Sequence, residues 1–144
     1  MTALVGVGVL AALALVGLLA PSTDVVARVV SPNGDVQAVL VETNGGATTS
    51  FGYEVSVVPS GSNRPGPIAA RLYGAVRNDH AYGVNLRWVS GSQLNVEFKQ
   101  ARDAKLEQPA LTVSGRRVSV ALQAGVTDPD APPGGMLYNL QSSK

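Results

Sequence analysis

The side chains best suited to proton transfer at neutral pH lie together, where Asp79 precedes His80, the single histidine of the chain. A histidine beside a carboxylate can serve as a general base, because its unperturbed pKa lies near neutrality. A nucleophilic triad also needs a serine on a sharp turn, and the sequence contains no Gly-x-Ser-x-Gly motif. We therefore interpret Asp79-His80 as part of a loop before a strand and do not expect an enzyme. A small exported hydrolase that uses His80 with Asp79 is the alternative.

Metal and thiol chemistry have little support in the composition. The chain has no cysteine, which removes disulfides, thiolate catalysis and cysteine-based metal sites. Asp128-Pro129-Asp130 places two carboxylates in a loop, but the Gly and Glu spacing of a defined calcium loop is missing. We expect no bound metal ion and no organic cofactor.

The segment from Asn44 to Ser50 contains two glycines and three hydroxyl side chains between two predicted strands. Such a loop can present its backbone amides to a ligand. The alternative, which we favour, is a wide loop in which Gly45 and Gly46 adopt positive φ. From this loop and from the loop around His80 we take the candidate binding residues Asn44, Gly45, Gly46, Thr48, Thr49, Asp79, His80 and Tyr82.

Charge is nearly balanced, with 11 Lys plus Arg against 10 Asp plus Glu. A surface for nucleic acid needs a basic stripe, and the only adjacent basic pair is Arg116-Arg117, so no nucleic-acid partner is expected. The spacing of four other arginines along the chain does not show whether they lie close together in the fold. They are Arg71, Arg77, Arg87 and Arg102.

The elements that would position these residues are strands. Apolar and polar side chains alternate over 35–43, 51–58, 82–89, 94–98 and 118–122, and more weakly over 68–76. Such alternation is typical of antiparallel sheets with one packed and one wet face. Residues 60–67 are rich in Pro and Gly and are predicted to form a loop, whereas 101–108 is the only helical turn that we expect.

The predicted fold is mostly β, an antiparallel sheet of five to seven strands in a small sandwich or open barrel. We divide the chain into an N-terminal segment over 1–21, the β domain over 22–125 and a Pro/Gly-rich extended tail over 126–144. The expected core contains Leu40, Val55, Val57, Trp88, Val96, Phe98 and Val120.

The first twenty residues have no charged side chain, and Thr2 carries their only side-chain hydroxyl. A helix over 3–20 would span about 27 Å, close to one hydrocarbon core. A cleaved signal peptide normally carries Lys or Arg before its apolar run, and this chain has none there. We therefore favour a retained single-pass membrane helix over a signal peptide or a buried core helix. Arg28 lies beyond the segment and by the positive-inside rule would favour a cytoplasmic domain, but it is a single distant charge.

Three stretches resemble an uncharacterised family of small bacterial envelope proteins. They are Ser31-Pro32-Asn33-Gly34, the run over 44–51 (Asn-Gly-Gly-Ala-Thr-Thr-Ser-Phe) and the second hairpin over 84–98. The family pattern often has Asp at the position of Asn33 and Cys at that of Gly45. The similarity covers about residues 31–100 and implies an apolar N-terminal segment followed by a β domain outside the cytoplasm, but no activity.

Together these observations favour a membrane-anchored β domain on the extracytoplasmic side of the cell membrane, acting as an interaction or binding module. Its expected partners are the membrane and an envelope protein or glycan. A periplasmic inhibitor-type module is a further alternative, which would need a protruding loop such as 61–64.

Overall fold

The computed structural model describes residues 22–46, 49–78 and 81–127. These residues are mostly β and contain no helix, which confirms the predicted fold class at this level. The strands are β1 (Ser22–Val30), β2 (Val36–Asn44), β3 (Phe51–Pro59), β4 (Ile68–Tyr73), β5 (Arg77–Asn78), β6 (Ala81–Tyr82), β7 (Asn85–Ser90), β8 (Gln93–Glu97), β9 (Asp103–Leu106), β10 (Ala110–Val113) and β11 (Arg116–Gln123).

The predicted N-terminal helix and the tail beyond Thr127 lie outside the described residues. Among the residues that the structure does describe, no helix has the length and apolarity needed to cross a membrane.

Five strands form the first sheet, in the order β1-β2-β3-β4-β9, and every neighbouring pair is antiparallel. The turn over 31–34 connects β1 to β2, with Gly34 at a φ of 79°. The β1–β2 register shifts between Val25 and Ala27, so β1 carries a bulge. This bulge interrupts the alternation that would have marked β1 in the sequence, and no strand was predicted there.

The second sheet has the order β10-β11-β8-β7, and β5 and β6 form a separate two-stranded hairpin. The hairpin β7–β8 is antiparallel, as the alternating runs predict. β11, however, pairs with β8 in parallel, so the expectation of a purely antiparallel sheet is wrong at this pair. Between them the chain crosses to the first sheet as β9 and returns as β10, which brings β11 back in the direction of β8.

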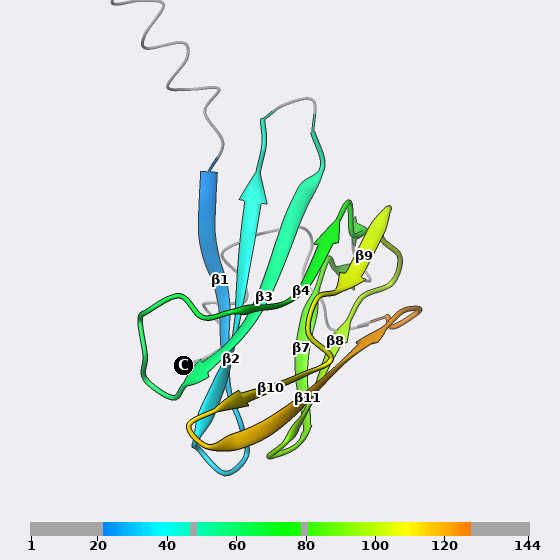
Figure 1. Ribbon diagram of the computed structural model, residues 1–144. Coiled ribbons are helices and arrows are strands. Elements are labelled where there is room, and N and C mark those ends of the chain that lie inside the picture. Colours follow the sequence, from blue (N-terminus) through cyan, green and yellow to red (C-terminus); the bar gives the residue numbers. More distant parts are fainter. Residues whose placement is uncertain (1–21, 47–48, 79–80, 128–144) are drawn as a thin grey trace, which may run out of the picture.

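The two larger sheets face each other around one hydrophobic core (Figure 1). Of the seven predicted core residues, six are buried; the exception is Trp88, which is partly buried against the core. The Trp88 ring sits on β7, and its Nε1 donates a hydrogen bond to the carbonyl of Val29 on β1 at 2.9 Å. An indole N–H needs an acceptor when its ring is buried, so this residue ties the two sheets together at their edges.

The predicted helical turn over 101–108 is wrong, because Asp103–Leu106 forms strand β9 at the edge of the first sheet. Its pairing with β4 places Ala104 opposite Leu72 and Leu106 opposite Ala70. Tertiary pairing thus overrides the weak local preference of this short segment. The predicted strand over 68–76 is shorter than expected and ends at Tyr73.

The loop over 60–67 is confirmed as a loop, but its segment 61–64 does not project freely. It folds over the outer face of the first sheet, in front of β1 to β3 (Figure 1). Arg28 Nη1 and Gln37 Nε2 both donate hydrogen bonds to the carbonyl of Ser62, at 3.3 and 2.9 Å. These two bonds hold the loop to β1 and β2 at Ser62.

Candidate binding site

An open cavity of about 680 Å³ lies at the end of the first sheet. Because neighbouring strands are antiparallel, the start of β3, the end of β4 and the start of β9 meet at this edge. We call it the end-of-sheet cavity, and it is lined by Thr49, Ser50, Phe51, Gly74, Ala75, Val76, Gln100, Ala101 and Arg102.

Main-chain hydrogen bonds hold the three lining segments together. The Gly74 amide donates to the Phe51 carbonyl at 2.9 Å, and the Val76 amide donates to the Gln100 carbonyl at 2.8 Å. The Ser50 amide also donates to the Tyr73 hydroxyl at 3.0 Å. The cavity walls are therefore fixed to the sheet by bonds that do not depend on a ligand.

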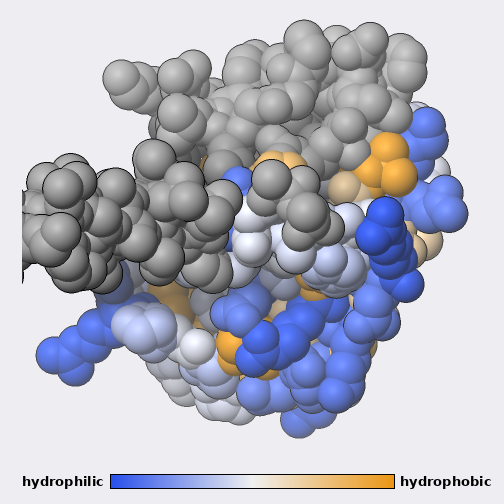
Figure 2. Space-filling view, turned by 90° about the horizontal axis from the view of Figure 1, so that it is seen from above, coloured by the Kyte–Doolittle hydropathy of each residue, from blue (hydrophilic) through white to orange (hydrophobic). Residues whose placement is uncertain are grey.

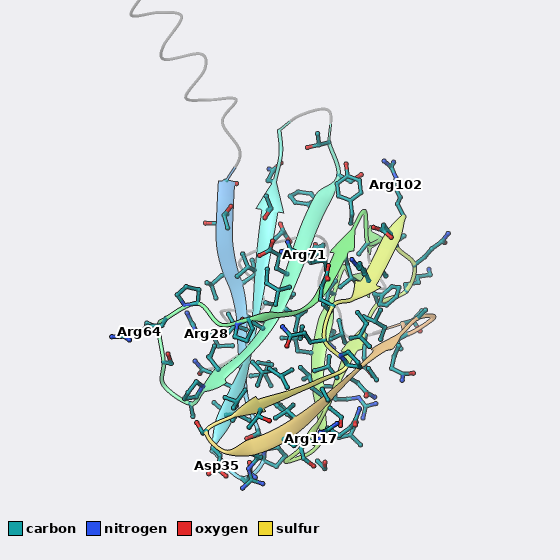
Figure 3. The ribbon with its side chains drawn as sticks, viewed as in Figure 1. Arg28, Asp35, Arg64, Arg71, Arg102 and Arg117 are labelled. Atoms are coloured by element: carbon teal, nitrogen blue, oxygen red, sulfur yellow. The ribbon has the colours of Figure 1, made fainter. Side chains whose placement is uncertain are left out.

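Gly74 and Arg102 form the side of the cavity next to β9. Gly74 has a φ of 66°, and a Cβ at this position would lie 2.9 Å from Cγ and Cδ of Arg102. The aliphatic part of Arg102 therefore packs directly over the glycine, which favours the absence of a side chain there. Arg102 itself is exposed and extends beyond the end of the sheet (Figure 3).

The lining combines one cation with neutral hydrogen-bonding groups. Arg102 supplies a guanidinium, Gln100 an amide, and Thr49 and Ser50 hydroxyls, while Phe51 adds an aromatic ring. None of the lining residues is an acid or a histidine. Figure 2 looks onto this end of the molecule, and the part of its surface that is not drawn in grey is mainly hydrophilic with small hydrophobic areas. Such a lining can bind a polar, anionic ligand.

The predicted loop over 44–50 contributes to the cavity through its second half only. Asn44 Oδ1 accepts a hydrogen bond from the Gly46 amide at 3.0 Å, and the Thr49 amide and hydroxyl both donate to the Gly46 carbonyl at 3.3 Å. Asn44 and Gly46 therefore shape the loop, and Thr49 is the candidate residue that reaches the cavity.

The two glycines of this loop differ in their roles. Gly46 has a φ of 112°, which agrees with the expected positive φ. Gly45 does not have a positive φ; instead, a Cβ there would lie only 2.5 Å from Thr49 Oγ1. Close approach, rather than backbone conformation, is therefore the reason that glycine suits position 45.

Four further candidates from the sequence cannot be placed relative to this cavity from the described residues. Thr48, Asp79 and His80 lie outside those residues, and Tyr82 is described only as part of β6. The segments around Gly74 and Gln100 were missed, because neither carries a motif and they lie far apart in the chain. Gly74, a glycine within the predicted strand over 68–76, was the one available signal.

Arg71, Arg87 and Arg102 do not form a single cluster. Arg71 pairs with Glu54 and, at 3.6 Å, with Glu107 on the outer face of the first sheet. Arg87 Nε lies 2.9 Å from Glu97 Oε2 on the second sheet. These two arginines therefore belong to local ion pairs of separate sheets, and Arg102 is the cation of the cavity.

Within residues 22–46, 49–78 and 81–127, no three potential ligands (His, Cys, Asp or Glu) group closely enough to hold a metal ion. Comparison with known proteins found no matching family model, no similar curated protein and no similar solved structure. The resemblance to small envelope proteins therefore stays a prediction.

Proposed function

We propose that this chain is a binding module of the bacterial cell envelope, a small β sandwich with the end-of-sheet cavity as its ligand site. The observation that carries the proposal is the convergence of segments 49–51, 74–76 and 100–102 on one cavity with walls fixed by hydrogen bonds. A pre-formed cavity of about 680 Å³ has the size typical of small-molecule sites.

The lining favours a sugar that carries an acidic group. The Gln100 amide and the hydroxyls of Thr49 and Ser50 match the hydrogen-bonding groups of a saccharide, and Phe51 offers apolar surface. Arg102 adds a charged donor whose planar guanidinium suits a carboxylate or phosphate. The proposed ligand is therefore an acidic glycan of the envelope, bound without chemical conversion.

The position of the cavity fits a ligand near the membrane. Ser22, the first residue of β1, pairs with Asn44, the last residue of β2, so β1 begins at the same end of the sheet as the β2–β3 loop. A membrane helix over 3–20 would enter the domain at this end. In the proposed arrangement, the domain lies on the extracytoplasmic side and the cavity opens toward the membrane surface.

The test uses the full-length ¹⁵N-labelled chain in dodecyl maltoside micelles, titrated with N-acetylmuramic acid, a soluble sugar that carries a carboxylate. We expect amide shifts that saturate and are concentrated in 74–76 and 100–102. Neutral N-acetylglucosamine should bind at least about tenfold more weakly, because it lacks the partner of Arg102.

Two arginine variants locate the site. Arg102→Glu should abolish the saturable shifts, whereas Arg117→Glu should retain them. Arg117 is exposed on β11, and Figure 3 places it at the other end of the molecule from Arg102. Shifts that persist in Arg102→Glu, or that map away from the cavity, would show that the proposed site is wrong.

A further inference from the structure

A second hollow, of about 230 Å³, lies on the outer face of the first sheet beneath the loop over 60–67. Its lining is mainly aliphatic where the sheet and the loop meet, and polar at the rim. We call it the outer-face groove. The aliphatic part consists of Val25, Val39, Val41, Pro65 and Ile68.

The groove is held in shape by contacts between the loop and the sheet. The Ser62 carbonyl is bound from two strands, by Arg28 and by Gln37. At Gly66, a Cβ would lie 2.5 Å from Cγ1 of Val58, so the loop backbone packs directly on β3. Val58 is only 3% exposed although it belongs to the outer face of the sheet. This packing means that a ligand would meet a groove that already exists.

The rim of the groove is positively charged. Arg28 and Arg64 both line it, and neither forms an ion pair with any carboxylate of the described residues. The one acidic lining residue, Glu54, already pairs with Arg71. Arg28 uses one donor for the Ser62 carbonyl, and a guanidinium has five. Figure 3 shows the Arg64 side chain directed away from the sheet, whereas Arg28 lies on β1. An exposed side chain changes rotamer within nanoseconds. The rim therefore offers Arg28 to an anion directly, and Arg64 after a change of rotamer.

We propose that the outer-face groove binds the C-terminal residue of a peptide whose last side chain is aliphatic. The side chain would occupy the slot between Val39, Val41 and Ile68. The terminal carboxylate would pair with Arg28 and, once its side chain has turned toward the groove, with Arg64. An apolar cavity of about 150 Å³ is large enough for benzene. The outer-face groove therefore has room for one branched aliphatic side chain beside the carboxylate. The positive charges of Arg28 and Arg64 favour a ligand that carries a carboxylate over a neutral apolar ligand.

The test titrates the full-length ¹⁵N-labelled chain in dodecyl maltoside micelles with acetylated hexapeptides that end in Leu, Val, Ile or Phe. We expect saturable amide shifts in 39–41 and 62–68 with at least one aliphatic terminus. The same peptide with a C-terminal amide should bind at least about tenfold more weakly, because its terminal charge is absent.

Arg64→Glu is the informative variant, since Arg64 is exposed and its charge reversal leaves the sheet intact. It should weaken peptide binding at least about tenfold, whereas the matched charge reversal Arg117→Glu should leave binding unchanged. Dispersed amide spectra of both variants show that they are folded.

Three results would overturn the proposal. The first is the absence of saturable shifts with the peptides that end in Leu, Val or Ile, whether or not the Phe peptide binds. The second is equal binding of the acid and amide forms, and the third is unchanged binding to Arg64→Glu. Decanoate, which has a carboxylate and an alkyl chain, separates a peptide terminus from a lipid. If decanoate binds as tightly as the best peptide, the occupant is a fatty acid and the peptide proposal is wrong.

Discussion

Replacing Trp88 tests how the edges of the two sheets are joined. Trp88→Phe removes the 2.9 Å hydrogen bond to the Val29 carbonyl and part of the ring that packs against the core. The net contribution of a neutral hydrogen bond is about 0.5–1.5 kcal/mol. The smaller ring loses about 40 Å² of buried apolar surface, or about 1 kcal/mol. We expect the free energy of unfolding to fall by about 1.5–2.5 kcal/mol.

Trp88→Ala should cost about 3 kcal/mol, near the lower end of the range for a large aromatic residue, because the ring is only partly buried. The control is Val89→Ala, which changes a neighbouring side chain that is 54% exposed and should shift stability by less than about 0.5 kcal/mol.

The assay is urea unfolding of the full-length chain in dodecyl maltoside, followed by far-UV circular dichroism, since Trp88 is the only tryptophan. With a slope of about 1–3 kcal/mol per molar urea, Trp88→Phe should lower the midpoint by roughly 1 M. A midpoint for Trp88→Phe equal to that of the parent would refute the reasoning. So would a loss below about 1 kcal/mol in Trp88→Ala, because the ring would then not stabilise the joined edges.

Two further predictions concern stability in the same assay. Leu40→Ala should destabilise the domain by about 2–5 kcal/mol, because Leu40 is 0% exposed in the shared core; a loss under 1 kcal/mol would contradict this packing. Asp35→Asn, which breaks the pair with Arg116 between the β1–β2 and β10–β11 turns, should cost at most about 1 kcal/mol because both partners are exposed. That loss should shrink in 1 M NaCl, and a salt-independent loss would contradict an exposed ion pair.

Much of the sheet could be predicted because its strands show clean alternation. The residues facing the core, such as Val55 and Val57 on β3, recur at a spacing of two, and both are buried as expected. Alternation indicates that one face of a strand is packed, but it does not indicate which other strand pairs with it. The parallel pairing of β11 with β8 depends on the path of the chain through β9 and β10, so the sequence pattern could not show it.

The strands that could not be predicted from the sequence are mainly short or irregular. The bulge at Val25–Ala27 breaks the alternation of β1, and β9 and β10 have only four residues each. Their strand structure depends on pairing with neighbours rather than on local preference. The loop over 44–50 could be predicted from the sequence because of its glycines and hydroxyl side chains. It could not show that Gly74 and Arg102, which lie far from that loop in the chain, line the same cavity as Thr49.

The most direct test of the end-of-sheet cavity as a ligand site is photo-crosslinking in bacterial cells that produce the full-length chain. The photoreactive residue p-benzoylphenylalanine is placed at Ala101, which lines the cavity, or at Thr112, which is exposed on β10. We predict that irradiation yields a glycan-containing adduct from position 101 and none from position 112, and that Arg102→Glu abolishes it. Equal labelling from both positions, or an adduct from position 101 that Arg102→Glu leaves unchanged, would contradict the proposed site.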